Sequence, residues 1–316
     1  MFEKRQRFGL VKFLDLKLPT WQADVRFRGR SRLIACAVLE TDTGLILVDP
    51  GPTSTLKTLE RALTPLGGLQ AVNDVVLTHI HLDHAGCVGQ LAANLPEVSI
   101  HVHPIGARHL INPERLIRSA TRIYKERMET LWGAILPVPA SQVRAIADGT
   151  LLQIGRRALR ACYTPGHASH HIVWFDDAAG VVFAGDAAGM RIEGADHIIP
   201  VAPPPDIDLV AWEETLSMLE TENPKQLFLT HFGLIRDVKE HLHRMRERLR
   251  AWSDAVRHSL DADHESDVAR AAVFHESEMT LMKASVGIAD QEPYGYMGQP
   301  RESWYGLARY WRKQLI

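Results

Sequence analysis

Three histidines and one aspartate lie within six positions of the segment THIHLDHAG, residues 78 to 86. The run NDVVLT that leads into it is apolar and typical of a strand. In an extended segment, residues two apart project to the same side, so His79 and His81 can offer their imidazoles to one metal ion. Asp83 and His84 then point elsewhere and can approach a second ion beside the first. Chance clustering among sixteen histidines is the alternative, but it rarely places four ligand-type residues behind an apolar strand.

Four more polar residues follow apolar, β-rich runs. His167 lies in ALRACYTPGHASHH, Asp186 ends GVVFAGD, His231 ends KQLFLTH and Asp49 ends GLILVD. Each alone is more typical of a cap or a turn, but ligands at successive strand ends converge on one edge of a sheet sandwich. Imidazole nitrogen and carboxylate oxygen suit zinc, iron or manganese in a hydrolytic site. With the first motif, His167, Asp186 and His231 complete seven ligand candidates, enough for two ions.

The order of these motifs resembles that of a known family. THIHLDHAG, TPGHASHH, FAGD and LTHFG, with VDPGP upstream, are similar to the motifs of the metallo-β-lactamase-fold hydrolase superfamily. The resemblance covers about residues 30 to 235, and its first motif is highly specific. It implies an α/β (α+β) fold, a four-layer αββα sandwich with the site at one edge.

The resemblance also implies a division of the ligands between two metals. The first metal would be bound by three imidazoles, those of His79, His81 and His167. The second would be bound by Asp83, His84 and His231, and Asp186 would bridge both. Asp49 corresponds to an upstream aspartate of the family, which orients a ligand imidazole by accepting its free N–H.

Departures from individual branches of the family narrow the activity. True β-lactamases of this fold carry Cys or Ser where this chain has Asp186, which argues against antibiotic hydrolysis as the main reaction. Flavodiiron oxidoreductases have Glu in place of His81, so this chain favours hydrolysis. Persulfide dioxygenases share the motif but use a single iron. Glyoxalase II has the bridging Asp, but its glutathione-binding region does not align with the segment after His231.

The expected function is therefore that of a dinuclear metal hydrolase. Two divalent ions are expected, zinc first, with iron or manganese as alternatives, about 3.5 to 4 Å apart around a hydroxide nucleophile. The substrate would be a small molecule with an ester-type bond: a carboxylic ester, lactone, thioester or phosphoester. Asp83 is the candidate to deliver a proton to the leaving group. The alternatives are a mononuclear iron dioxygenase acting on a glutathione persulfide and a regulatory protein that retains metals without turnover.

Periodicity predicts the elements that must position these residues. Strands are predicted near 31 to 40, 43 to 49, 74 to 78, 98 to 103, 158 to 163, 171 to 176, 180 to 185 and 226 to 230. Helices are predicted at 54 to 65, 85 to 94 and 207 to 222, where apolar residues recur every three or four positions. Strands and helices mixed in this order suit a layered domain.

Two segments lie outside that predicted core. Residues 104 to 147 form a helical insertion in which Tyr124, Met128 and Trp132 share one helix face. This stripe packs on the sandwich, walls the substrate pocket or forms a subunit contact. Residues 236 to 316 form a helical and aromatic extension on a catalytic domain of residues 1 to 235. Its aromatic residues should dock on the core, the pocket or a second subunit, as in a homodimer. They are Tyr294, Tyr296, Trp304, Tyr305, Tyr310 and Trp311.

Composition agrees with a catalytic globular protein. With 316 residues and 46% hydrophobic content, the chain can bury a large core. A net charge of −2 argues against a nucleic-acid or membrane-surface binder. No apolar run approaches 18 residues, and the first sixteen residues include several charges and do not resemble a signal peptide, which predicts a cytoplasmic protein. Cys36, Cys87 and Cys162 lack metal or disulfide spacing, so reduced core thiols are expected.

Overall fold

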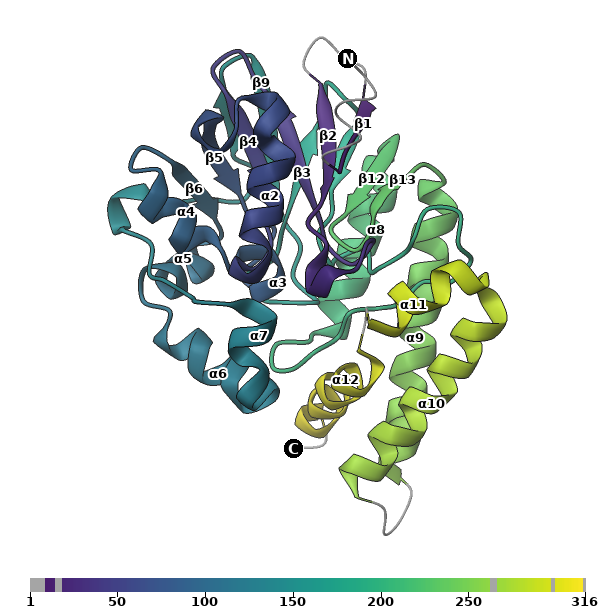
Figure 1. Ribbon diagram of the computed structural model, residues 1–316. Helices are drawn as coiled ribbons and strands as arrows, with labels where there is room; N and C mark the ends of the chain where they lie inside the picture. The colour runs from purple at the N-terminus through teal and green to yellow at the C-terminus, as the bar shows by residue number, and fades with distance from the viewer. Residues whose placement is uncertain (1–8, 15–18, 262–265, 297–298, 315–316) are drawn as a thin grey trace.

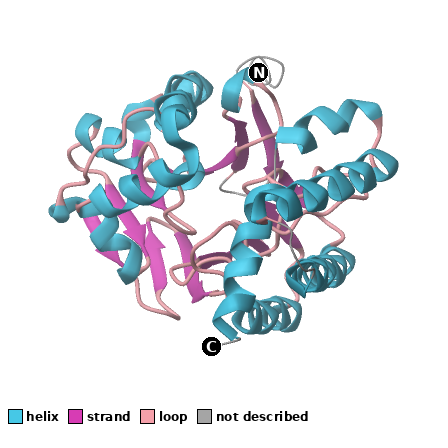
Figure 2. Cartoon of the chain, turned by 90° about the horizontal axis from the view of Figure 1, so that it is seen from below, coloured by secondary structure: helices cyan, strands magenta, loops and turns pink. Residues whose placement is uncertain are grey.

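Two β-sheets pack face to face in the computed structural model, and helices cover their outer sides (Figures 1 and 2). The structure describes residues 9–14, 19–261, 266–296 and 299–314. The charged segment at residues 1–8 lies outside the described part of the chain. The arrangement is the four-layer αββα sandwich expected from the sequence.

The first sheet takes its strands in chain order. They are β1 (Leu10–Leu14), β2 (Thr20–Asp24), β3 (Ala35–Glu40), β4 (Leu45–Val48), β5 (Val72–Val76), β6 (Ser99–Val102) and β7 (Val143–Ala145). Neighbours are antiparallel from β1 to β4 and parallel from β4 to β7. Parallel neighbours need crossover connections, and they end at the same edge of the sheet. The ends of β4 and β5 therefore lie side by side.

The second sheet has the order β13-β12-β11-β10-β9-β8. Its strands are β8 (Leu151–Ile154), β9 (Arg157–Tyr163), β10 (Ile172–Asp176), β11 (Val181–Phe183), β12 (Gln226–Leu229) and β13 (Gly233–Ile235). Only β11 and β12 run parallel, so these two strands also end at a shared edge.

Helices connect and cover these strands. The α-helices are α2 (Leu56–Leu63), α3 (Leu82–Ala85), α4 (Val88–Asn94), α5 (Pro104–Ile111), α6 (Glu114–Tyr124), α7 (Met128–Trp132), α8 (Leu209–Glu222), α9 (Val238–Asp261), α10 (Asp267–Ser285), α11 (Ile288–Tyr296) and α12 (Pro300–Gln314). Short 3₁₀ helices are η1 (Phe27–Gly29), η2 (Thr53–Thr55), η3 (Thr64–Leu66), η4 (Leu69–Ala71), η5 (Lys125–Arg127) and η6 (Ala140–Gln142).

The predicted elements are confirmed. All eight predicted strands are present as β3 to β6 and β9 to β12, and the predicted helix at 85 to 94 is divided into α3 and α4. The other two predicted helices are α2 and α8. Five further strands were not predicted from the sequence: β1, β2, β7, β8 and β13. The expected insertion contains α5, α6 and α7, and it ends in β7.

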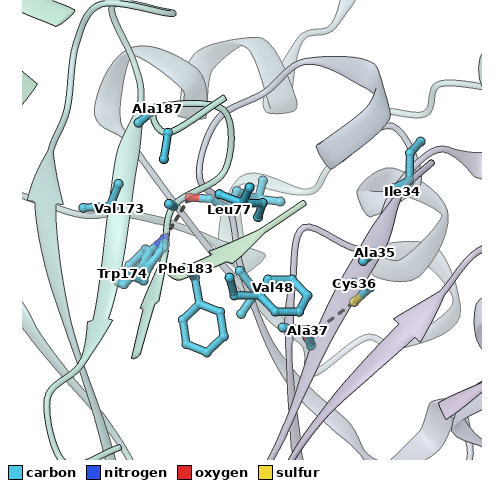
Figure 3. Packing of buried hydrophobic residues seen from close by; sticks show 14 of the residues in the cluster. Ile34, Ala35, Cys36, Ala37, Val48, Leu77, Val173, Trp174, Phe183 and Ala187 are labelled. Carbon is cyan, nitrogen blue, oxygen red and sulfur yellow. Dashed lines mark hydrogen bonds between the residues drawn. The ribbon is translucent and has the colours of Figure 1, made fainter. Parts of the chain in front are cut away.

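The core lies between the sheets and is built from side chains of both. Figure 3 shows Val48 and Leu77 from the first sheet side close to Trp174 and Phe183 of the second. Trp174 is fully buried, and its indole Nε1 donates to the backbone oxygen of Leu77 at 3.0 Å. This hydrogen bond satisfies the polar end of a large apolar side chain and joins the two sheets just before the first histidine motif.

The aromatic residues near the C-terminus dock on their own chain. Trp304 is fully buried, and its Nε1 donates to Ser259 Oγ of α9 at 3.0 Å. Trp311 donates to the backbone oxygen of Ser253, also on α9, at 3.1 Å. Figure 1 shows α9, α10 and α12 together on one side of the molecule. The division of the chain at residue 235 into a catalytic domain and an extension stays a prediction.

No helix in the described ranges is both long and apolar enough to cross a membrane. The three cysteines are free thiols, and Cys36 and Cys87 are buried in the core as expected. Burial raises the pKa of the Cys87 thiol, which makes it a poor nucleophile although it lies close to the first motif.

A buried ion pair links the sheets away from the core's centre. Arg157, at the start of β9, donates to the carboxylate of Asp176 at 2.6 Å, and both side chains are almost fully buried. Arg157 also donates to Thr20 Oγ1 on β2 at 3.2 Å and to the backbone oxygen of Glu40 on β3 at 3.3 Å. One guanidinium therefore holds the first sheet against the second.

We expect Arg157→Met to lower the free energy of unfolding by about 3 to 5 kcal/mol, because Asp176 would remain buried without its partner. The matched control is Arg156→Met, since Arg156 is exposed and pairs only with Asp42 at the surface. Urea unfolding followed by circular dichroism measures both variants. Equal loss of stability in the two would show that the buried pair is not what joins the sheets.

Candidate metal centre

All seven predicted ligands come together at one edge of the sandwich. His79 and His81 lie in the loop after β5, Asp83 and His84 on α3, and the last three after β9, β11 and β12. Two compact groups result, in each of which the potential ligand atoms lie within 4.8 Å of one another. The first group is His79, His81, His167 and Asp186, and the second is Asp83, His84 and His231.

The first group has the spacing of a metal-binding cluster. His167 Nε2 lies 3.2 Å from His79 Nε2 and 3.0 Å from His81 Nδ1. Imidazole nitrogens around one tetrahedral zinc ion, each about 2.0 to 2.1 Å from it, are roughly 3.3 Å apart. Asp186 Oδ2 lies 3.4 Å from His167 Nε2 and provides the fourth potential ligand.

The second group shares Asp186 with the first. His231 Nε2 lies 3.4 Å from Asp83 Oδ2, and His84 Nε2 lies 3.3 Å from Asp186 Oδ1. His231 Nε2 is also 3.7 Å from the same Oδ1 atom. One oxygen of Asp186 therefore faces the first group and the other faces the second, which is the arrangement of a bridging carboxylate.

Hydrogen bonds on the far side of each ring fix which nitrogen faces the centre. His167 Nδ1 donates to the backbone oxygen of Val201 at 2.5 Å, and His231 Nδ1 donates to that of Leu33 at 2.6 Å. His84 Nδ1 donates to Asp49 Oδ2 at 2.8 Å. Because Nδ1 is the donor in these three hydrogen bonds, Nε2 is the ring nitrogen that points inward.

Asp49 holds several of these segments together. Its Oδ1 accepts the backbone N–H of Thr78 at 2.8 Å. Its Oδ2 accepts from Thr78 Oγ1, Thr230 Oγ1 and His84 Nδ1 at 2.7 to 2.8 Å. Thr78 directly precedes His79, and Thr230 directly precedes His231. The hydrogen bond expected between Asp49 and the imidazole of a ligand candidate is present at His84.

Burial keeps the imidazoles of the first group neutral. It is the main cause that lowers the pKa values of His79, His81 and His167 below the usual range. A neutral imidazole is the form that binds a metal. These three rings are therefore suited to ligation near neutral pH.

The second group has a strongly negative environment. Burial alone would lower the pKa of His84, but the carboxylates of Asp186, Asp49 and Asp83 raise it well above the usual range. Burial likewise opposes the rise at His231, which Asp186 and Asp83 cause. Burial would raise the pKa of Asp83, yet His84 and His231 lower it to about 2. A site that attracts protons this strongly also attracts a cation.

Two buried atoms in this centre lack a hydrogen bond. They are His84 Nε2 and Asp186 Oδ1, which face each other across 3.3 Å between the two groups. Buried polar atoms without partners are rare because their desolvation costs about 1 to 3 kcal/mol each. A divalent ion bound between them would satisfy both, so these residues fit the metal that the motifs imply.

Two histidines of TPGHASHH, His170 and His171, were not predicted to have a role. His171 Nδ1 is 2.8 Å from Thr164 Oγ1, and its Nε2 accepts the backbone N–H of Asp186 at 3.3 Å. It therefore positions the loop that carries the shared carboxylate. His170 is buried beside His81, its Nδ1 has no partner, and it lines the cavity described next. Both stand within four residues of His167, which was the available signal.

A cavity of about 660 Å³ opens onto the centre. The ligand candidates that line it are His81, Asp83, Asp186 and His231. From the insertion, Tyr124 and Trp132 form part of its wall, where Phe27 stacks on Trp132 at 5.5 Å between ring centroids. From the C-terminal helices, Tyr296 and Ser303 line it.

The residues expected to pack on the core or to wall the pocket divide between these two positions. Tyr124 and Trp132 line the cavity and also pack on each other at 5.0 Å. Met128 does not line the cavity and packs against the cluster that contains Leu131 and Trp132. It begins α7, whereas Tyr124 ends α6, so the expectation that these residues share one helix face is wrong. Trp304 and Tyr305 do not line the cavity: Trp304 lies in the core and Tyr305 packs against it, which is one of the positions expected for these aromatic residues. Their helix α12 presents its opposite side, with Glu302 and Ser303, to the cavity.

Comparison with curated proteins finds relatives of the same fold family. The chain is 27% identical over 206 residues to the metallo-beta-lactamase fold-containing protein ST1585 of Sulfurisphaera tokodaii, covering 63% of this chain and 74% of the relative. It is 30% identical over 115 residues to the atrochrysone carboxyl ACP thioesterase of Aspergillus fumigatus. That match covers 36% of this chain and 27% of the relative.

Solved structures share the fold over most of the chain. The metallo-beta-lactamase family protein TTHA1429 from Thermus thermophilus superposes with a TM-score of 0.66 at 21% identity, covering 89% of each chain. The crystal structure of ST1585 superposes with a TM-score of 0.60, also at 21% identity, covering 87% of this chain and 93% of that one. These similarities extend the shared fold well beyond the residues that carry the motifs.

The profile of the metallo-beta-lactamase superfamily matches residues 30–231 of the chain, a stretch that includes every ligand candidate. The match agrees with the motif order, with the αββα layers and with the two groups of ligands at the sheet edge. The chain therefore belongs to the metallo-beta-lactamase superfamily, and it is a metal-dependent hydrolase.

Proposed function

We propose that the protein is a dinuclear metal-dependent hydrolase that cleaves a small ester-type bond. One observation carries the proposal: Asp186 Oδ2 faces the imidazoles of the first group, while Oδ1 faces His84 and His231. A mononuclear site would leave the second group without a function and with a buried, unpartnered nitrogen. The complete second group therefore favours two ions over the single iron of a dioxygenase.

Two divalent ions bound here would supply Lewis acidity and a water whose pKa is lowered to around 7. The chain itself provides the ligand candidates, the outer hydrogen bonds that orient them and a cavity that opens onto the centre. We assign His79, His81 and His167 to the first ion, Asp83, His84 and His231 to the second, and Asp186 to both.

Asp83 is our candidate for proton delivery to the leaving group. Its side chain is 28% exposed, whereas those of Asp186 and His84 are buried, and it lines the cavity. A carboxylate at the border of the cavity can reach both the centre and a bound substrate.

Burial raises the pKa of the nearby Tyr124 phenol, with the charge of Asp83 adding to the effect. Tyr124 therefore stays protonated and can donate a hydrogen bond to the substrate.

The cavity supports a small-molecule substrate. Its volume of about 660 Å³ lies within the usual range of ligand pockets, roughly 300 to 1,000 Å³. Carboxylic esters, lactones, thioesters and phosphoesters all react by attack of an activated water, so the centre suits each of them. The name of the Aspergillus fumigatus relative, a thioesterase, adds support for the thioester.

We expect the purified protein to bind close to two transition-metal ions per chain, and His231→Ala to retain about one. The reason is that His231 belongs to the second group and has no contact with the first three imidazoles. Elemental analysis after equilibration with excess metal measures the content. His243→Ala, an exposed histidine on α9, is the control and should keep both ions. A wild-type protein that holds one iron and consumes O₂ would contradict the dinuclear proposal.

Asp186→Asn tests the shared carboxylate. The amide keeps the shape of the side chain but loses the negative charge and one of the two anionic oxygens that face the groups. We expect the second ion to bind more weakly and turnover to fall by roughly 100-fold or more. Steady-state hydrolysis of an ester that the wild type cleaves gives the rate. A rate within a few-fold of wild type would refute a bridging role.

Substitutions in the cavity wall should change substrate preference without changing metal content. Tyr124→Phe and Trp132→Ala alter contacts to the substrate, because both side chains line the cavity but lie outside the ligand groups. We expect the rank order of kcat/KM among ester, lactone, thioester and phosphoester substrates to shift. Met128→Ala is the control, since Met128 belongs to the same insertion but does not line the cavity. An unchanged rank order in both wall variants would place specificity elsewhere.

A further inference from the structure

One wall of the cavity is rich in arginine. Arg108 comes from α5, while Arg115, Arg118 and Arg122 come from α6, and all four line the cavity. Residues of both α6 and α12 line the cavity, and Figure 1 shows α6 to the left of α12 in the lower part of the molecule. The four arginines are exposed, so they form the mouth of the cavity and the metal centre forms its floor.

Three of these arginines have no counter-ion. Arg118 pairs with Glu114 at 3.4 Å, but Arg108, Arg115 and Arg122 have neither an ion pair nor a side-chain hydrogen bond among the described residues. Arginines elsewhere on the surface are commonly paired. Arg160, for example, contacts both Asp177 and Glu222. The mouth of the cavity therefore holds unneutralised positive charge.

The spacing on α6 arranges these charges in a row. Arg115, Arg118 and Arg122 are three and four residues apart, so they lie along one helix face. Seven residues of α-helix span roughly 10 Å, at about 1.5 Å per residue. The neighbouring apolar stripe, which includes Leu116 and Ile123, also lines the cavity. An extended ligand with several negative charges fits this row better than a single small anion.

The cavity lining contains fewer free carboxylates than arginines. Asp206 and Glu302 are the carboxylates in the cavity lining apart from the two ligand candidates. Asp206 is engaged by the hydroxyl of Ser169 at 2.9 Å. Near α5, partial burial and then the charges of Arg108 and Arg115 lower the pKa of His109, which also lines the cavity. The local potential on this wall is positive.

We infer that the arginine wall binds a phosphate-bearing group of the substrate, and that the substrate is an acyl thioester of a coenzyme A-type carrier. The inference rests on the proposed hydrolase function and specifies its substrate class. In such a thioester the phosphates are many bonds away from the acyl group. The thioester can therefore reach the metal centre while the phosphates contact Arg108, Arg115 and Arg122 at the mouth.

The other ester-type bonds fit this division less well. A phosphoester would place its phosphate at the metal centre and leave the arginine wall without a ligand. A small lactone or simple carboxylic ester carries no second charged group. Hydrolysis of the thioester adds the hydroxyl group of water to the acyl carbon and breaks the C–S bond. The leaving thiolate takes the remaining proton of that water, which Asp83 is placed to transfer.

The test uses one acyl group on three carriers: pantetheine, 4′-phosphopantetheine and coenzyme A. These carry no phosphate, one phosphate and three phosphates, so they differ in charge but not in the bond that is cleaved. We expect KM to fall along the series, by about tenfold between the first and the last, as for one strong charge-assisted contact. The assay is repeated with acyl groups of several lengths, so that a preference for one acyl group is not mistaken for a preference for a carrier.

The variant Arg115→Ala/Arg122→Ala tests the wall directly. We expect the KM for the coenzyme A thioester to rise by about tenfold, with kcat and metal content preserved and the pantetheine thioester unaffected. Arg127→Ala is the matched control, because Arg127 belongs to the same insertion but does not line the cavity. Added salt should weaken the preference for coenzyme A in the wild type and not in the double variant.

The outcomes separate this inference from the function on which it rests. Equal KM values for all three carriers, with thioester hydrolysis intact, would refute phosphate binding by the arginine wall. The proposed hydrolase function would be unaffected. Equal KM values for the phosphopantetheine and coenzyme A thioesters would refute binding of several phosphates by the wall. They would instead indicate a substrate whose thioester is attached to a carrier protein. Failure of the two-metal protein to hydrolyse any ester-type bond would overturn the proposed function itself.

Discussion

The buried carboxylate of Asp49 is the contact on which the rest of the centre depends. It accepts hydrogen bonds from two threonines and one imidazole, which belong to three different segments. Each segment carries at least one ligand candidate, and the segments come from both sheets. A carboxylate buried this deeply is stable only while its donors stay in place, since an unpaired buried charge is costly. The position of Asp49 and the positions of the ligands are therefore coupled.

The sheet topology explains why this coupling is available. Asp49 and the first histidine motif follow β4 and β5, which run parallel, and Asp186 and His231 follow β11 and β12, the parallel pair of the second sheet. Parallel neighbours end at a common edge, so each sheet delivers its ligands to one place. Close packing at that place requires Gly185, where a Cβ atom would lie 2.5 Å from Thr78 Oγ1. The residue before the shared carboxylate must therefore be small.

The sequence allowed the residues that meet at the centre to be identified because their chemistry is concentrated in short motifs behind apolar strands. The strands β3 to β6 and β9 to β12 were predictable for the same reason, since buried strands are almost continuously apolar. By contrast, β8 has the alternating exposure of an edge strand, with Leu151 62% exposed, and β13 has only three residues. Which side of α12 lines the cavity was not predictable, because aromatic residues indicate burial without indicating which partner buries them. Trp304 thus packs on α9 and leaves its neighbour Ser303 at the cavity.

Chemistry and recognition lie on separate elements in this molecule. The ligands and their outer hydrogen bonds belong to strand ends and α3, where almost every side chain is buried and each position is fixed by several partners. Part of the cavity wall belongs to α5, α6, α7 and α12, and the arginines that α5 and α6 contribute to it are exposed. Changes on α6 can therefore alter which molecule enters the cavity at little cost in stability, whereas changes at the strand ends disturb the fold and the centre together. Such a division would let one hydrolytic centre serve different substrates through changes in the helices that line its cavity.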